Sequence, residues 1–239
     1  AGISVPGYLG YPPGAPLPTL GEILNGSPPA NSQPVTVMTP PGTAYAYSGG
    51  GYEIIEAVIQ DVTGEPFAAA MKTLVLEPAG MVDSLFAQPL PDSLVTRAAT
   101  GHTQDGREVP GGWRVVPELA AGGLWSTPED LAKLLVALVQ AIKSARAPVL
   151  SQDTVRTMLV RQPPGPYGLG AAISGEGEAL ALMKRGQNIG YQSFLILFPF
   201  LGQGMVVMTN SDNGTTLANA LVRRAGQTYR WPPLGALMD

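Results

Sequence analysis

The 239-residue sequence lacks cysteine altogether and has a single histidine, His102. Disulfides, a cysteine nucleophile and zinc sites rich in cysteine or histidine are therefore excluded, and a Ser-His-Asp triad would have to use that one histidine. His102 lies in the turn-rich stretch TGHTQDGRE, which favours an exposed or hydrogen-bonded loop residue over a catalytic one.

Positive charge and long apolar runs are scarce as well. The 14 lysines and arginines stand against 18 acidic residues, and they are scattered singly except at Lys184-Arg185 and Arg223-Arg224. We therefore expect no basic surface for nucleic acid. No apolar run approaches the roughly 18 to 20 residues of a membrane span. With 45% apolar residues, the chain is predicted to fold as a globular protein with a substantial core.

Helices are predicted after a proline-rich start. Residues 1–42 hold ten of the 24 prolines and one possible helical turn at 19–24, so a long extended loop is expected there. Thr127 and Pro128 supply the N-cap and the first position of the clearest helix. The predicted helices run from Tyr52 to Thr63, from Pro66 to just before Pro78, from Pro128 to about Ser144 and from Thr215 to about Tyr229.

Apolar spacing also predicts which side of three helices is buried. In the first of them, the apolar residues should face the core and the acidic residues the solvent. The residues expected to be buried are Ile54, Ile55, Val58, Ile59 and Val62 in that helix, Leu131, Leu134, Leu135, Leu138, Val139 and Ile142 in the third, and Leu217, Leu221, Val222 and Ala225 in the last. Those expected on the exposed side of the first are Glu53, Glu56, Gln60 and Asp61.

The final third of the chain changes to short β-prone runs separated by glycine-containing turns. Antiparallel strands with tight connections are predicted, covered by the last helix. The predicted fold class is α+β, with an extended loop and mostly helical lobe at 1–150 and the sheet with its covering helix at 151–239. Residues 84–122 should form loop with short strands. The β-prone runs are YGLGAAIS, ALALMKRG, QSFLILFPF and GMVVMTNS.

Two stretches offer chemistry. Tyr47 precedes three glycines and a helix, and the positive end of that helix would favour negative charge near the phenol. The alternative is a ring that only packs beneath the glycine-rich turn. Lys184 closes an apolar strand and precedes Gly186, where the missing side chain would let a ligand lie along the backbone. The alternative is a charged edge strand that discourages aggregation.

In chain order, these stretches resemble the penicillin-recognising serine hydrolases, which include class C β-lactamases, D-alanyl-D-alanine peptidases and family VIII-type esterases. Those enzymes use Ser-x-x-Lys, then Tyr-x-Asn, then Lys-Thr-Gly or a variant of it. Tyr47-Ser48-Gly49 is similar to the second motif and Lys184-Arg185-Gly186 to the third. The likeness covers nearly the whole chain through LEPAGMVDS, AAGGLWSTPEDLAKL and GYQSFLILFP.

The resemblance implies an all-α lobe beside an α/β lobe with a central antiparallel sheet, and an active site between them. It also implies acyl transfer through a serine ester without metal or other cofactor. Tyr47 would act as general base or proton shuttle, and Lys184 would polarise that proton network and hold the substrate carboxylate. The backbone amide of Gln187 would supply half of an oxyanion hole.

The other positions of the two motifs are expected to contact the substrate or depart from the family pattern. Ser48 and Gly186 are expected to face the substrate. Gly49 stands where the family has an asparagine that orients the substrate amide, and Arg185 stands where it has a hydroxyl residue. Arg185 could bind a carboxylate through its planar guanidinium instead. Recognition of β-lactams and peptides is therefore left open.

The nucleophile motif is absent. No Ser-x-x-Lys exists, because the residues three positions before the four lysines are Ala69, Asp130, Gln140 and Ala181. Ser48 is disfavoured as a substitute, since its position in the family is structural or substrate-facing. The opening AGISVPGY is similar to a family segment that follows the nucleophile, so we expect an N-terminally truncated chain that is inactive alone.

Three interpretations stay open. In the first, the chain is part of a serine hydrolase that acts on a small-molecule or peptide-like acyl substrate, namely an ester, amide or β-lactam. In the second, it is a non-catalytic penicillin-binding-like protein for peptidoglycan-type or other carboxylate ligands. In the third, another chain completes the sheet. Surface exposed by a missing segment would favour homo-oligomers. The sequence leaves the compartment undecided, although a periplasmic or secreted location is typical of the family.

Overall fold

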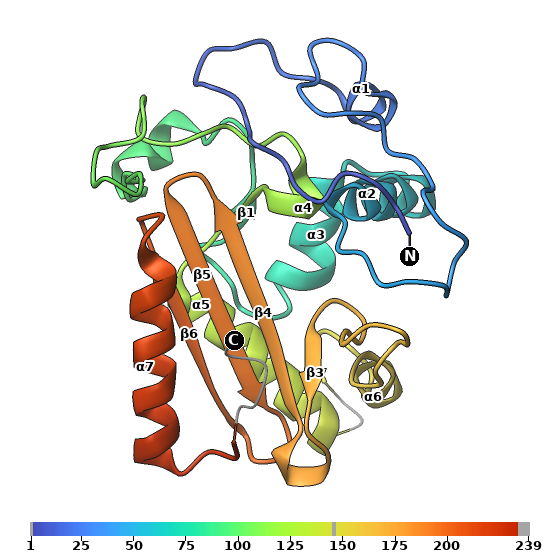
Figure 1. Ribbon diagram of the computed structural model, residues 1–239, viewed down its shortest axis with the longest axis vertical. Coiled ribbons are helices and arrows are strands. Elements are labelled where there is room, and N and C mark those ends of the chain that lie inside the picture. The colour runs from blue at the N-terminus through green and yellow to red at the C-terminus, as the bar shows by residue number, and fades with distance from the viewer. Residues whose placement is uncertain (1, 145–146, 234–239) are drawn as a thin grey trace.

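The computed structural model describes residues 2–144 and 147–233. Its centre is an antiparallel sheet of order β3-β4-β5-β6, which lies below a group of short helices in the view of Figure 1. Each strand overlaps one of the four β-prone runs, which confirms the α+β class with a central antiparallel sheet. The strands are β3 (Ala172–Ser174), β4 (Ala181–Asn188), β5 (Tyr191–Phe198) and β6 (Gln203–Thr209).

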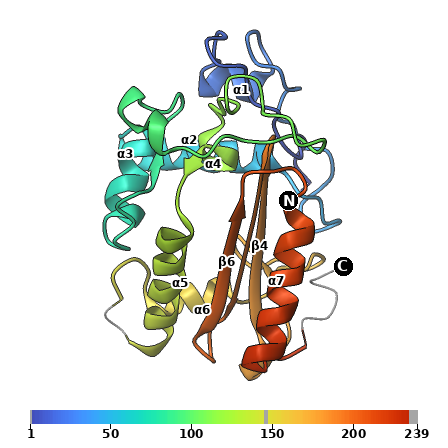
Figure 2. The same ribbon diagram turned by 90° about the vertical axis from the view of Figure 1, so that its left-hand side faces the viewer.

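The sheet has two apolar faces because side chains alternate along its strands. Leu182 belongs to the cluster that packs with helix α5 (Pro128–Lys143), and Met183 to the cluster that packs with helix α7 (Gly214–Tyr229). Figure 2 shows the sheet edge-on between these two helices. The layer order is therefore helix, sheet, helix.

Helix α5 begins and packs as predicted. The side chain of Thr127 accepts a hydrogen bond from the amide of Asp130, and Leu135 and Leu138 are buried in the cluster beside the sheet. A short helix, α6 (Gln152–Met158), adds to the same cluster and was not predicted. The predicted division of the chain into residues 1–150 and 151–239 stays a prediction. Helix α5 belongs to the first of these parts and packs against the sheet of the second.

Helix α7 forms where expected, but its buried side is displaced from the predicted one. Val222 is fully buried and Ala218 nearly so, whereas Leu217 and Leu221 are 54% and 40% exposed. Small residues set this orientation, because a Cβ on Gly214 would collide with the side chain of Thr209. The helix therefore lies close to the sheet along its small residues, and the two leucines face outward.

The helical group above the sheet is built from short elements. The single turn expected near the start is α1, and the stretch before Pro78 begins as an α-helix and continues as a π-helical turn. Within the described residues, no helix is long and apolar enough to cross a membrane. The elements are α1 (Leu20–Asn25), α2 (Gly49–Thr63), α3 (Phe67–Met71), the π-helical turn Lys72–Leu76, β1 (Leu85–Phe86), the 3-10 helix Asp92–Arg97, α4 (Leu119–Gly122) and β2 (Leu124–Trp125).

Helix α2 has the reverse of its predicted orientation. Glu53 and Glu56 are 0% and 4% exposed, whereas Ile55 and Val58 are 49% and 53% exposed. Ile54 and Val62 lie on the exposed side as well. The prediction failed because it ranked side chains by hydropathy alone, whereas the two glutamates bind backbone amides of α4. The apolar side of α2, with Ile54, Ile55, Val58 and Val62, is left as an exposed apolar patch.

The packing of α7 predicts different costs for two adjacent truncations. Val222→Ala should lower the free energy of unfolding by about 2 kcal/mol, because it leaves a cavity at a fully buried position. Leu221→Ala should change it by less than about 0.5 kcal/mol, because the side chain is largely solvated. Urea denaturation of the two variants checks this. Equal losses would show that the helix faces the sheet as the sequence predicted.

Candidate active site

Tyr47 and Lys184 meet beside the middle of strand β4. The ammonium Nζ of Lys184 donates a hydrogen bond to the phenol oxygen of Tyr47 over 3.1 Å, although 137 positions separate the two residues in the sequence. Strand β3 pairs with β4 only as far as Met183, so β3 does not flank Lys184. Tyr47 is 44% exposed. The ring is therefore not sealed in the interior, and the pair is open to solvent.

Three tyrosine rings surround the Lys184 ammonium. Its Nζ lies 4.9 Å from the ring centroid of Tyr47, 5.3 Å from that of Tyr52 and 5.7 Å from that of Tyr167. Burial lowers the pKa of Lys184, but the oxygens of Tyr52 and Tyr47 outweigh burial and leave that pKa raised. The side chain is therefore a fixed positive charge at neutral pH, held by aromatic faces and one hydrogen bond.

The start of α2 does not point free amides at Tyr47, contrary to the sequence expectation. The amides of Gly49 and Gly50 donate to the carbonyls of Pro6 and Val5 over 3.2 and 3.0 Å. The amide of Gly51 donates to the hydroxyl of Ser48 over 2.9 Å. These amides are thus satisfied by the N-terminal segment and the cap, and the positive charge next to Tyr47 is that of Lys184.

Close packing explains the glycines that follow Tyr47. A Cβ on Gly50 would lie 2.9 Å from the carbonyl oxygen of Ser4, and one on Gly49 would lie 3.2 Å from the ring of Tyr8. The backbone of the N-terminal segment therefore lies directly against the first turn of α2. Gly49 and Gly50 therefore form a tight contact with this segment.

Ser48 acts as the N-cap of α2. Besides accepting from the helix, its hydroxyl donates to the carbonyl of Ser4 over 2.6 Å. The single hydroxyl proton is therefore used inside the protein, which agrees with disfavouring Ser48 as a nucleophile. The predicted contact of Ser48 with a substrate stays a prediction.

Arg185 and Lys184 lie on opposite faces of the sheet. The guanidinium of Arg185 donates to Asn219 of α7 over 3.3 Å and lies over the ring of Phe194. The structure therefore does not bring Arg185 to the pair, because adjacent strand residues alternate. His102 is also elsewhere, with its ring nitrogen 3.1 Å from the carbonyl oxygen of Asn210.

The remaining predicted positions follow Lys184 along β4. Gly186 pairs with Ser193, and a Cβ at that position would meet the Ser193 hydroxyl. The neighbouring Ser193 side chain thus favours a glycine at this position, and the predicted contact of Gly186 with a substrate stays a prediction. Gln187 is exposed near the end of the strand. The part of β4 beyond its pairing with β3 holds the backbone amide predicted for an oxyanion, and that role stays a prediction.

Buried glutamates connect the two halves of the site. Glu56 accepts a hydrogen bond from the amide of Ala120 over 2.9 Å, and Glu53 accepts one from the amide of Ala121 over 3.1 Å. The other end of α4 is attached to the sheet, because Asn188 of β4 donates to the carbonyl of Gly122 over 2.9 Å. Helix α4 thus links the helix that follows Tyr47 to the strand that carries Lys184.

These carboxyl groups are held away from water. Burial, followed by the charge of Glu56, raises the pKa of Glu53 to about 8. Burial raises the pKa of Glu118 to about 7, and neither of its carboxyl oxygens has a hydrogen-bond partner. No group of three or more acidic or histidine side chains in the described ranges is placed to hold a metal ion. Burial thus raises the pKa of each carboxyl group in the cluster, and Glu53 is mostly neutral at pH 7.

No sequence motif identified Tyr45, Tyr52, Tyr167 or Glu118 as residues of the site. A signal for Tyr45 was present in the stretch AYAYS, since residues two apart lie on one side of an extended segment and Tyr45 should therefore accompany Tyr47. Nothing in the sequence placed Tyr167 beside them.

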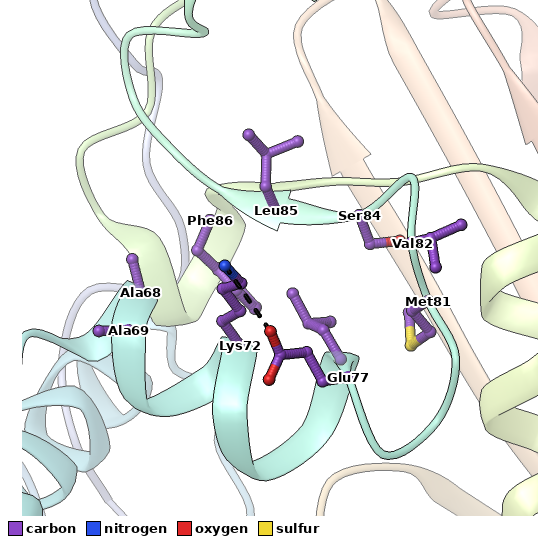
Figure 3. Close-up of a pocket in the computed structure, with 10 residues that line it drawn as sticks. Ala68, Ala69, Lys72, Glu77, Met81, Val82, Ser84, Leu85 and Phe86 are labelled. Atoms are coloured by element: carbon purple, nitrogen blue, oxygen red, sulfur yellow. Dashed lines mark ion pairs between the residues drawn. The ribbon is translucent and has the colours of Figure 1, made fainter.

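A surface pocket of about 580 Å³ lies apart from this pair, on α3, the π-helical turn and β1 (Figure 3). Its lining includes Met81, Leu85 and Phe86, together with the exposed ion pair Lys72–Glu77 at 3.7 Å. It contains neither Tyr47 nor Lys184. Its lining is mostly apolar, so it offers little of the chemistry that the pair offers.

Comparison with known families agrees with the geometry. The family model described as Beta-lactamase matches residues 9–229. The chain belongs to the beta-lactamase family. Both Tyr47 and Lys184 lie inside the matched range, and the helix-covered antiparallel sheet is the fold that the resemblance implied.

The family relationship is distant at the level of individual proteins. The D-aminopeptidase of Gluconobacter oxydans (strain 621H) is 22% identical over 201 residues, which are 83% of this chain and 37% of that protein. The octameric penicillin-binding protein homologue from Pyrococcus abyssi matches with a TM-score of 0.63 at 25% identity, over 80% of this chain and 44% of the other. The penicillin-binding protein from Bacillus halodurans gives 0.66 at 22% identity, over 86% and 61%. The chain therefore spans between 37% and 61% of the length of these relatives.

The buried carboxyl of Glu53 predicts a pH-dependent stability. Its pKa in the folded protein, about 8, exceeds the ordinary carboxyl value of 4.5, so the folded state holds the proton more tightly. This stabilisation is complete below pH 4.5 and is lost as the pH rises through 8. Glu53→Gln mimics the protonated acid and does not titrate. Between pH 6 and pH 8, the free energy of unfolding should therefore fall by roughly 2 kcal/mol more in the wild type than in Glu53→Gln.

Urea denaturation across this pH range measures the difference. Glu65→Gln, an exposed change just beyond α2, serves as the control and should follow the wild-type pH profile. Parallel profiles for wild type and Glu53→Gln would contradict a neutral carboxyl at this position.

Proposed function

We propose that the chain carries the proton-transfer and carboxylate-binding part of a serine acyl hydrolase site. The observation that carries this proposal is the 3.1 Å contact between the Lys184 ammonium and the Tyr47 phenol. These are the positions that match the second and third motifs of the family. Two residues so distant in sequence, joined by one hydrogen bond at an open site, fit a catalytic pair better than the packing ring and the charged edge strand considered as alternatives.

The chemistry follows from the charges. An ammonium at hydrogen-bond distance stabilises negative charge on the Tyr47 oxygen, so that Tyr47 in its phenolate form takes the proton of an alcohol and becomes a neutral phenol. The alcohol oxygen attacks the acyl carbonyl, and the phenol returns its proton to the leaving group. A water molecule that gives its proton to Tyr47 later hydrolyses the ester and restores the alcohol. The amide of Gln187 would hold the carbonyl oxygen as negative charge forms on it. Lys184 would also bind a carboxylate of the substrate.

The attacking alcohol is proposed to come from polypeptide other than residues 1–239. The sequence has no Ser-x-x-Lys, and the hydroxyl of Ser48 already donates to Ser4. The exposed apolar patch of α2, with Ile55 and Val58, lies on the helix that follows Tyr47 and Ser48. The added segment is proposed to pack on that patch. The same patch supports the proposal that the chain self-associates when it is alone.

The substrate is proposed to be a small-molecule or peptide-like acyl compound. The D-aminopeptidase among the relatives favours an amide over an ester or a β-lactam. The second candidate function is reversible binding of carboxylate ligands without catalysis. It is favoured by the same charged Lys184 at an open site and by the internal use of the Ser48 hydroxyl.

A fluorescent fluorophosphonate separates the two functions, because it labels only an activated alcohol. The 239-residue chain should remain unlabelled. The protein encoded together with its upstream sequence should be labelled at a serine, and Tyr47→Phe or Lys184→Ala should slow that labelling at least about 100-fold. Tyr229→Phe, an exposed tyrosine on α7, is the matched control. A longer protein without a labelled serine would leave reversible binding as the function.

A further inference from the structure

Tyr45 and Tyr167 form a stacked pair beside the Lys184 ammonium. Their ring centroids are 5.5 Å apart and their planes differ by 20°, so the rings lie nearly parallel. Tyr45 is 43% exposed, and the Tyr47 ring lies 6.2 Å from that of Tyr167. The stack therefore presents an aromatic surface that continues from the catalytic pair.

The segment before β3 holds the stack in place. Gly165 is buried, and a Cβ at that position would collide with the ring of Tyr45. The segment is closed by hydrogen bonds from the amide of Gln162 to the carbonyl of Tyr167 and from the amide of Ile173 to the carbonyl of Pro166. The ring of Tyr45 thus rests on a glycine backbone that is itself fixed by turns.

Tyr45 stays uncharged at physiological pH. Burial, followed by the proximity of Tyr167, raises the pKa of Tyr45 to about 12. Its exposed part can therefore receive an apolar or aromatic group, while Lys184 supplies a positive charge nearby. The Lys184 Nζ is 5.7 Å from the centroid of Tyr167, which matches a ligand whose planar group lies one or two carbons from its carboxylate or carbonyl.

We propose that Tyr45 and Tyr167 form a subsite for the aromatic side chain of the acyl compound whose carbonyl or carboxylate end lies at Lys184. The inference rests on the proposed role of Lys184 in holding that end. It adds a preference within the substrate class, namely arylacetyl or aromatic aminoacyl groups over small aliphatic ones. Tyr45 is the specificity residue of the pair, because it touches Tyr167 rather than the ammonium.

Binding of two simple carboxylates to the 239-residue chain tests the subsite without catalysis. Phenylacetate and acetate are titrated separately while NMR follows the side-chain signals of the lysines, and Lys184→Ala assigns the signal of Lys184. Phenylacetate should bind about tenfold more tightly than acetate, a ratio typical of one good aromatic contact. Tyr45→Ala should reduce the ratio to about one without changing acetate binding, and Tyr45→Phe should retain it.

Each outcome separates the subsite from the proposed function. If acetate binds through Lys184 but phenylacetate gains nothing, or if Tyr45→Ala keeps the tenfold ratio, the subsite is overturned and the role of Lys184 survives. If neither carboxylate shifts the Lys184 signal, both the subsite and the carboxylate-binding role fail. Tyr229→Ala, which removes an exposed ring on α7, should leave both affinities unchanged. Unchanged acetate binding by Tyr45→Ala shows that the variant is folded.

Discussion

The hydrogen bonds between the buried glutamates of α2 and the first amides of α4 determine the geometry of the site. Glu53 and Glu56 hold α4 from one side, and Asn188 of β4 holds it from the other. The helix after Tyr47 and the strand with Lys184 are therefore joined twice, through α4 and through their own contact. Burial raises the pKa of both carboxyl groups, so the folded state favours their neutral forms over buried unpaired charge.

The elements of the fold were predictable because local signals agreed with one another. Thr127 and Pro128 began α5, and the alternating runs gave the four strands. The orientation of α2 was not predictable from hydropathy, because the amides that Glu53 binds belong to a helix of four residues more than 60 positions away. The prediction of the buried face of α7 failed for a related reason, because the close approach of Gly214 to Thr209 sets the orientation of that helix.

The core of the site was predictable from motif order, and its surroundings were not. Tyr47 and Lys184 meet as the resemblance implied, although their catalytic roles stay a proposal. Adjacent residues of a strand point to opposite faces of the sheet, so Arg185 could have been placed on the face away from Lys184. The interpretation of Lys184-Arg185-Gly186 as one contiguous motif did not take this alternation into account. Tyr167 comes from a loop whose path no local pattern specified. Such contacts arise from tertiary packing, which a single sequence does not show.

Residues 4–6 are attached to the start of α2 by hydrogen bonds, and we expect this attachment to open independently of the rest of the helix. The amides of Gly49 and Gly50 are protected by carbonyls of a separate segment rather than by their own helix. Deuterium should therefore replace those two protons whenever the N-terminal arm detaches, while the rest of α2 stays coiled. Local detachment of this arm would release the turn that holds Tyr47 and would be visible as early exchange at two neighbouring glycines.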